Sequence, residues 1–354
     1  MSTTRNKTID LFRGLIISDM IIMHFVGNFP RPIVTAIELF DFAIEGFILL
    51  AGFMIGGHYL PKFRKDKLGV SKRLAMRAIK IAAIQYLLIL TVSLPFYAFT
   101  QFTAIDKFIA FATTSFLFLN QIPIIHILPT FIPLLAASPL ILLLLASNHD
   151  WWLVATSVGL FLLGLQNPYV FTIGQKTIFP VVLWQVYFVA GCIIGKKSAG
   201  GARVDSDRLL LCASLLFCAS LFMKYGGYFD VVSSIKAKYD IYPKKFPLNL
   251  YGLAYGASLL LFVYVVSLNL WERLTRGRQV LIALQLLGRH SLAVFVGHVY
   301  MVYGIRALVT AGANVLVVCG ATALSLVAIY FATLRVDRQC RAGTLPGAYR
   351  WLFA

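Results

Sequence analysis

The sequence predicts an all-α, polytopic integral membrane protein with about ten transmembrane helices. The hydrophobic set makes up 59% of its 354 residues and the mean hydropathy is +0.81, well above the roughly 45–50% apolar usage of soluble domains. Apolar runs near the ~20 residues that cross a bilayer recur along the chain. The net charge of +18 comes from Lys and Arg in the gaps between these runs. This placement is typical of cytoplasmic loops and indicates a lipid bilayer, not nucleic acid, as the partner.

We expect ten spans and one short helix that does not cross. The spans are predicted at about residues 10–29, 36–60, 73–98, 124–147, 151–165, 178–195, 208–224, 248–270, 280–304 and 311–334. Residues 100–120 contain an apolar run that is too short and too polar at its start, which favours an interfacial or re-entrant helix. No internal repeat is visible, which weakens the case for a transporter built on inverted halves. Residues 1–354 are predicted to form a single transmembrane domain.

The basic gaps also predict orientation. Five basic segments, including both termini, lie on one side of the membrane if there are ten spans, which places the N-terminus and the C-terminus in the cytoplasm. The exception is the longest loop, residues 225–247, which carries four Lys on the predicted outer side. Either this loop serves a ligand, or the rule is noisy here. The first apolar segment lacks a small-residue cleavage site and is expected to be retained.

The first span carries ionisable groups that are costly in hydrocarbon unless shielded or paired. Arg13 and His24 are separated by almost three helical turns, so they share one face about 16 Å apart along the axis. Asp19 points about 140° away from His24. One interpretation is that Arg13 and His24 lie at two depths along a path across the membrane. The other is that Arg13 snorkels to the headgroups and His24 hydrogen-bonds a neighbouring helix.

Two further groups of charges stand in or near the next spans. Glu45 lies inside the second span and requires a cationic or hydrogen-bonded partner. The candidates are a basic residue of another helix and His24, whose ring the carboxylate would then orient. Arg73, Arg77 and Lys80 form one cationic stripe in the third span. The stripe could pair the oxygens of a phosphorylated ligand, or it could serve topology and anionic lipid.

Polar residues in later spans complete the candidate set. Trp184 and Gln185 form a polar pair in the sixth span, and the ninth span carries Arg289, His290, Ser291 and His298. Ser291 and His298 share a face, but seven residues separate them by roughly 10 Å, too far for direct proton transfer. The five cysteines fit buried small residues, and the six histidines show no ligand spacing, so no metal site is expected.

Several of these segments resemble a known superfamily. FRGLIISDMIIMH (12–24) resembles the hallmark of the acyltransferase 3 superfamily of membrane-bound acyltransferases, and IEGFILLAGF (44–53) its second-helix motif, with Ala51 where Ser is usual. The segments HILPTFIPLL (126–135), FPVVLWQVYFVAGCIIG (179–195) and LGRHSLAVF (287–295) are more similar to the OpgC-type branch, whose members succinylate periplasmic glucans. IKIAAIQY departs from that branch, which more often has His near Gln85, and His298 is closer to the wider superfamily.

The resemblance implies a function. It implies a single acyltransferase domain that moves a succinyl or acetyl group from cytoplasmic acyl-CoA to a hydroxyl of an extracytoplasmic glycan, in a bacterial inner membrane and without a permanently bound cofactor. In this hypothesis His24 is the general base, with Glu45 and Arg13 as further catalytic residues. The predicted substrate-binding residues are Arg73, Arg77, Lys80, Trp184, Gln185, Arg289, His290, Ser291 and His298, of which Gln185 or Arg289 would stabilise the oxyanion.

Two other functions fit the same residues. Arg13, Asp19, His24 and Glu45 could form the proton relay of a secondary transporter or flippase. A non-catalytic sensor with a lipid-binding pocket is the third hypothesis. The departures from the OpgC-type pattern leave the acyl group and the acceptor open, and the sequence does not predict the oligomeric state.

Overall fold

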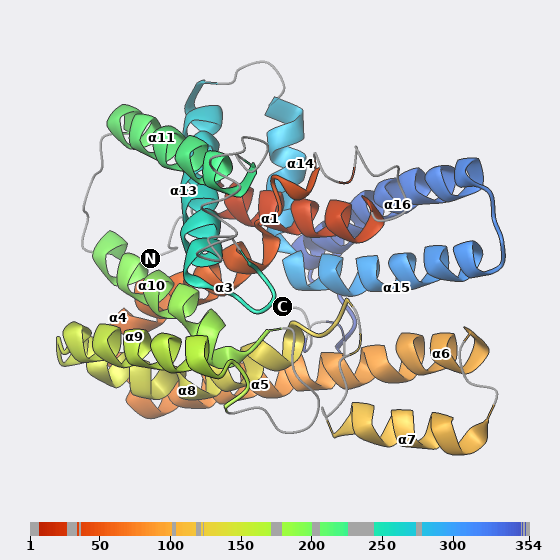
Figure 1. The fold of residues 1–354 in the computed structure, drawn as a ribbon, viewed down its shortest axis with the longest axis horizontal. Helices are drawn as coiled ribbons and strands as arrows, with labels where there is room; N and C mark the ends of the chain where they lie inside the picture. Colours follow the sequence, from red (N-terminus) through yellow and green to blue (C-terminus); the bar gives the residue numbers. More distant parts are fainter. Residues whose placement is uncertain are drawn as a thin grey trace. The chain divides into compact units, whose positions relative to one another are not determined.

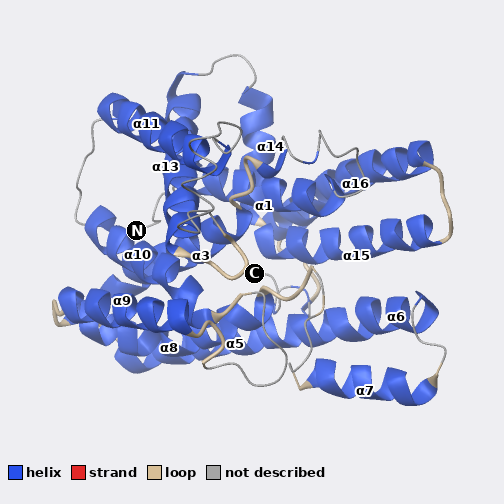
Figure 2. Ribbon diagram, in the orientation of Figure 1, coloured by secondary structure: helices blue, strands red, loops and turns tan. Residues whose placement is uncertain are grey.

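The structure is a computed structural model, and its described part is helical. It describes residues 7–26, 34, 37–100, 104–117, 122, 124–170, 179–199, 206–225, 244–273, 278–347, 349 and 351. Within these ranges the named elements are all helices, and Figure 2 shows helices and connecting loops with no strand. The predicted all-α class is therefore confirmed for the described residues.

Seven helical stretches in the described residues are long and apolar enough to cross a membrane. They are Ala43–Phe63, Lys67–Ala98, Leu128–Ala146, Val181–Ala199, Leu250–Asn269, Ser291–Thr310 and Leu316–Ala342. Shorter apolar helices cover Asp150–Gln166, Leu210–Phe222 and Gln279–Arg289. The helix that holds His24 is not among the seven, and it carries four charged residues, Lys7, Asp10, Arg13 and Asp19. An integral membrane protein is thus supported, whereas the count of ten spans and the side of each terminus stay predictions.

The helices group into two compact units. The first unit comprises residues 1–43, 80–129 and 275–354, and the second comprises residues 44–79 and 130–274. The first unit contains α1 (Lys7–Val26), the end of α5 (Lys67–Leu88), η2 (Ile89–Ser93), α6 (Leu94–Thr100), α7 (Ile105–Phe116), α14 (Arg278–Arg289), α15 (Ser291–Thr310) and α16 (Val315–Ala342). The second unit contains α3 (Ala43–Met54), η1 (Ile55–Tyr59), α4 (Leu60–Phe63), the start of α5, α8 (Leu128–Ala146), α9 (Asp150–Gln166), α10 (Val181–Ala199), α11 (Ser206–Tyr225) and α13 (Leu250–Arg273).

In the first unit, α1 packs directly against α14 and also contacts α15. Two glycines set the approach of α1 to α14. A Cβ added at Gly14 would lie 1.9 Å from the Leu284 carbonyl oxygen, and one added at Gly288 would lie 2.0 Å from the Asp10 carbonyl oxygen. The two backbones therefore touch, as small residues allow between membrane helices. α15 and α16 lie side by side and are joined by a short turn that includes Gly312 (Figure 1).

The predicted ninth span, residues 280–304, is two helices in the structure. α14 ends at Arg289, and α15 begins at Ser291. His290 stands between them with φ −108° and ψ 27°, outside helical geometry. The apolar run continues across this point, so hydropathy alone did not reveal the break. The physical reason is polar: Arg289 and His290 at the junction contact the same carboxylate of α16.

In the second unit, α10 is the central helix. It packs against α9 and against η1, where a Cβ added at Gly56 would lie 1.8 Å from the Cys192 carbonyl oxygen. α11 packs against α13. Short α7 lies within the segment predicted to be interfacial or re-entrant, and most of the predicted loop 225–247 lies outside the described residues.

Candidate functional site

Two histidines of the first unit form a direct hydrogen bond. His24 lies in the last turn of α1 and His298 lies within α15. The distance from His24 Nδ1 to His298 Nε2 is 2.9 Å. The ring planes differ by only 3°, and the ring centroids are 5.1 Å apart. The rings therefore meet edge to edge in nearly one plane, which is the arrangement that aligns the nitrogen lone pair with the N–H bond.

The two rings differ in exposure. His298 is fully buried, whereas His24 is half-buried. The second ring nitrogen of His298, Nδ1, is hydrogen-bonded to the backbone carbonyl of Phe295, one turn back along α15. Both nitrogens of His298 are thus engaged inside the protein. Only His24 combines a fixed ring with access for another molecule.

Two more basic residues act on His24 electrostatically. These are His126, which precedes α8, and Arg306 of α15. The Arg306 guanidinium lies 6.0 Å from the ring centroid of Tyr303 and has no acidic partner among the residues that the structure describes. His126 is half-buried, and its Nδ1 lies 3.3 Å from the Ile122 carbonyl oxygen. Of these two residues, Arg306 is the one that stays charged at every physiological pH.

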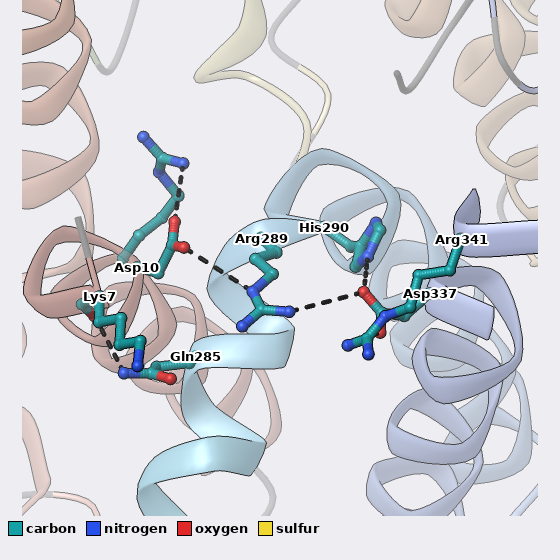
Figure 3. A network of polar contacts seen from close by, with 8 residues as sticks. Lys7, Asp10, Gln285, Arg289, His290, Asp337 and Arg341 are labelled. Carbon is teal, nitrogen blue, oxygen red and sulfur yellow. Dashed lines mark hydrogen bonds and ion pairs between the residues drawn. The ribbon is translucent and has the colours of Figure 1, made fainter. Parts of the chain in front are cut away.

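A network of charges joins α1, α14 and α16 at the other end of α1 (Figure 3). Arg289 Nε lies 3.8 Å from Asp10 Oδ2, and its Nη1 lies 3.8 Å from Asp337 Oδ1. His290 Nε2 lies 3.1 Å from the same Asp337 oxygen, and Arg341 reaches the other Asp337 oxygen at 2.6 Å. Both Arg289 and His290 were predicted to bind substrate. In this structure they connect helices.

The remaining ionisable groups of α1 are engaged close to their own positions. The Arg13 guanidinium lies 3.9 Å from the carboxylate of Asp10, which stands one helical turn earlier in α1. Asp19, which the sequence left without a partner, accepts a hydrogen bond of 2.9 Å from the backbone nitrogen of Phe42. Asp19 therefore anchors the chain directly before α3, a structural role that needs an acceptor oxygen.

Glu45 has its own ion pair in the second unit. Its Oε2 atom lies 3.1 Å from Lys245 Nζ, and the carboxylate is buried. Lys245 belongs to the lysine-rich loop singled out from the sequence, and it places a positive charge beside the buried carboxylate. The ring partner of His24 in the first unit is His298, and the orienting role expected of Glu45 stays a prediction.

Trp184 and Gln185 are buried within the second unit. The Gln185 amide donates to the Ser157 carbonyl at 2.8 Å, and its oxygen accepts from the Ser157 hydroxyl at 2.7 Å. An oxyanion contact would require Gln185 to exchange these bonds. Trp184 packs between Phe179 and Tyr187, and its Nε1 has no hydrogen-bond partner among the described atoms.

The cationic stripe is exposed where α5 begins. Arg73 and Arg77 are both exposed, and Arg77 donates to the Tyr59 hydroxyl at 3.0 Å. On the preceding η1 and α4 segments, Lys62 Nζ lies 2.7 Å from His58 Nε2. Lys80 lies in the first unit, with its Nζ 5.5 Å from the ring centroid of Trp351. Arg73 and Arg77 thus stay available to a ligand beside other cations.

The chain matches a known protein family. The model of the family described as OpgC protein matches residues 5–339. The chain belongs to the OpgC family. No curated protein and no solved structure matches the chain. The OpgC match spans both histidines of the pair and all of the charge network except Arg341. Membership of the OpgC family indicates a membrane acyltransferase for glucan modification.

Sequence reasoning missed four residues of this OpgC chain that surround the predicted ones. They are Asp10, His126, Arg306 and Asp337. Arg306 carried a signal, because a lone cation in a run as apolar as VYGIRALVT is costly in hydrocarbon without a function. The sequence gave no such signal for Asp337, because a charged residue among the arginines of a basic segment needs no special explanation.

Proposed function

We propose that this protein is a membrane-bound O-acyltransferase that moves an acyl group from cytoplasmic acyl-CoA to a hydroxyl of an extracytoplasmic glycan, with His24 as general base. The observation that carries the proposal is the bond between half-buried His24 and fully buried His298. A general base needs a fixed ring, a free nitrogen and access to its substrate. Membership of the OpgC family supports the reaction class and the glucan acceptor.

The reaction needs one proton transfer in each direction. His24 takes the proton of the sugar hydroxyl as the hydroxyl oxygen bonds to the thioester carbonyl carbon, and the carbonyl electrons move to oxygen. When the tetrahedral intermediate collapses, the carbon–sulfur bond breaks and the thiolate accepts the proton from His24. The products are the glycan ester and free CoA. Such positioned base catalysis contributes about 10²- to 10⁴-fold.

The donor's phosphates would bind to exposed cations of the second unit. This basic surface comprises Lys62, Arg64, Lys65, Arg73 and Arg77. Several cations side by side can pair phosphate oxygens with charge-assisted hydrogen bonds. The positive-inside pattern, which favours a cytoplasmic side for the same segment, supports a nucleotide that arrives from the cytoplasm.

Arg306 favours an acyl group that ends in a carboxylate. It is half-buried, it acts on His24 electrostatically, and none of the described acidic groups pairs with it. A partly buried guanidinium without a counter-ion is a natural receptor for a carboxylate, which it can bind through two parallel hydrogen bonds. We therefore favour a dicarboxylic donor such as succinyl-CoA over acetyl-CoA.

The central experiment replaces His24. The purified protein in lipid vesicles is incubated with labelled succinyl-CoA and a β-glucan, and ester formation and CoA release are measured. His24→Gln should lower turnover by at least about 10²-fold while the binding of CoA is retained. The matched control is His149→Gln, at an exposed histidine. Turnover of the His24 variant within tenfold of the unchanged protein would remove His24 from the role of base.

The proton-coupled transporter receives no support from the described contacts. Asp19 accepts a backbone hydrogen bond, Glu45 pairs with Lys245, and Arg13 lies beside Asp10, so these three residues have structural partners. Substrate uptake by protein-containing vesicles without any acyl-CoA would nevertheless favour the transporter over the acyltransferase.

A further inference from the structure

The contacts of His298 fix the position of a proton on His24. His298 Nδ1 faces the Phe295 carbonyl, and the Val294 carbonyl is a second backbone partner. A carbonyl oxygen only accepts hydrogen bonds, so Nδ1 of His298 must carry a hydrogen. In a neutral imidazole the other nitrogen is then an acceptor. His298 Nε2 therefore has a lone pair and no proton.

The same reasoning passes from His298 to His24. His24 Nδ1 lies 2.9 Å from the bare Nε2 of His298, so His24 Nδ1 must be the donor of this bond. That leaves the lone pair of neutral His24 on Nε2, the nitrogen opposite the bond. We propose that His298 is a positioning residue that holds His24 in the tautomer with a hydrogen on Nδ1 and a basic Nε2. This inference rests on the proposed function of His24.

The geometry suits a positioning role rather than substrate contact. His298 is fully buried, and both of its nitrogens are engaged. Its ring is coplanar with the His24 ring to within 3°, so the pair restricts rotation of the half-buried ring as well as its tautomer. In other sites, histidine tautomers are set in this way by the hydrogen bond that the second nitrogen makes. Here a second histidine takes the place that a carboxylate often occupies.

A neutral partner has one consequence for catalysis. A carboxylate partner would stabilise the protonated ring by charge, whereas neutral His298 offers only a hydrogen bond. Arg306, from the same helix α15, and His126 also act on His24, and neither carries a negative charge. His24 Nδ1 is therefore oriented by a hydrogen bond to a neutral ring, and not by an ion pair.

The test compares two replacements of His298 in the full chain in lipid vesicles. His298→Gln can place its amide oxygen near the former Nε2 and accept from His24, whereas His298→Leu has no acceptor. Nitrogen-15 magnetic resonance of histidine-labelled protein distinguishes a protonated from a bare ring nitrogen, and His24→Gln identifies the His24 signals. Turnover with succinyl-CoA is measured on the same samples, and His149→Leu is the matched control.

We expect His24 to show a protonated Nδ1 and a bare Nε2 in the unchanged protein. His298→Leu should mix the two tautomers and lower kcat by about 10- to 100-fold with little change in KM, and His298→Gln should restore part of both. A protonated Nε2 in the unchanged protein would overturn the inference. Equal loss in both variants with an unchanged His24 spectrum would also overturn it, because that pattern reports packing alone. The spectrum of the unchanged protein does not depend on turnover, so it separates failure of this inference from failure of the proposed function.

Discussion

The Arg289 guanidinium lies 3.8 Å from the Asp337 carboxylate, and this pair joins the end of α14 to α16. Arg289 also reaches Asp10 of α1, so one side chain connects three helices of the first unit (Figure 3). Both acidic groups are largely buried, with side-chain exposures of 6% for Asp10 and 12% for Asp337. Removing one partner from such a network leaves the other charges without compensation.

Replacing Asp337 with Asn should destabilise the first unit. The change removes the charge shared by Arg289, His290 and Arg341, and we expect a loss of roughly 1–3 kcal/mol, as for other hydrogen-bonded charges left without a partner. Thermal unfolding in detergent measures the effect. Arg341→Gln is the control, because its side chain is 71% exposed and exposed ion pairs contribute about 1 kcal/mol or less. Unfolding of the Asn variant at the temperature of the unchanged protein would show that the network is dispensable.

Neutralising the stripe at the start of α5 should weaken donor binding. For Arg73→Gln combined with Arg77→Gln we expect the KM for acyl-CoA to rise about 5- to 30-fold, the equivalent of roughly 1–2 kcal/mol, with kcat retained. Added salt should reduce the difference, because screening weakens exposed charges. The control is the double variant Arg335→Gln and Arg338→Gln, which removes two exposed charges from α16. An unchanged KM, or an equal rise in the control, would refute the assignment of the phosphates.

Replacing Arg306 should change the choice of acyl group. We expect Arg306→Gln to lower kcat/KM for succinyl-CoA by about 10- to 150-fold, the equivalent of roughly 1.5–3 kcal/mol for a hydrogen bond to a charged group. The value for acetyl-CoA should change little. Arg306→Lys keeps the charge and should retain part of the preference. If the ratio of the two kcat/KM values is the same in the unchanged protein and in both variants, Arg306 does not bind the distal carboxylate.

Two replacements of Asp19 distinguish a structural hydrogen-bond acceptor from a residue that carries protons. Asp19→Asn keeps an oxygen that can accept from the Phe42 backbone nitrogen, so acyl transfer should stay within about threefold, less than the loss of a cap or relay would cause. Asp19→Leu removes the acceptor and should lower thermal stability. Loss of activity in the Asn variant at unchanged stability would instead indicate that Asp19 exchanges protons.

Much of the fold could be predicted because apolar runs of sufficient length report helices directly. The predicted fourth span at residues 124–147, for example, is α8 at Leu128–Ala146. The break at His290 could not be predicted, since it depends on Asp337, which lies far along the chain. For the site, helical spacing identified His24 and His298 as separate candidates. Their hydrogen bond to each other depends on how α1 packs against α15. Residue spacing within a single helix carries no information about that packing.

The glycine contact between α1 and α14 also sets the angular position of the helix that carries His24. Gly14 and Gly288 bring two backbones together at one end of α1, and the His24–His298 bond holds the other end. Each added residue turns a helix by about 100°. One alanine inserted after Ile17 would therefore rotate His24 away from His298 while Gly14 kept its place. The angular register of α1, and not side-chain identity alone, thus determines whether the two rings meet.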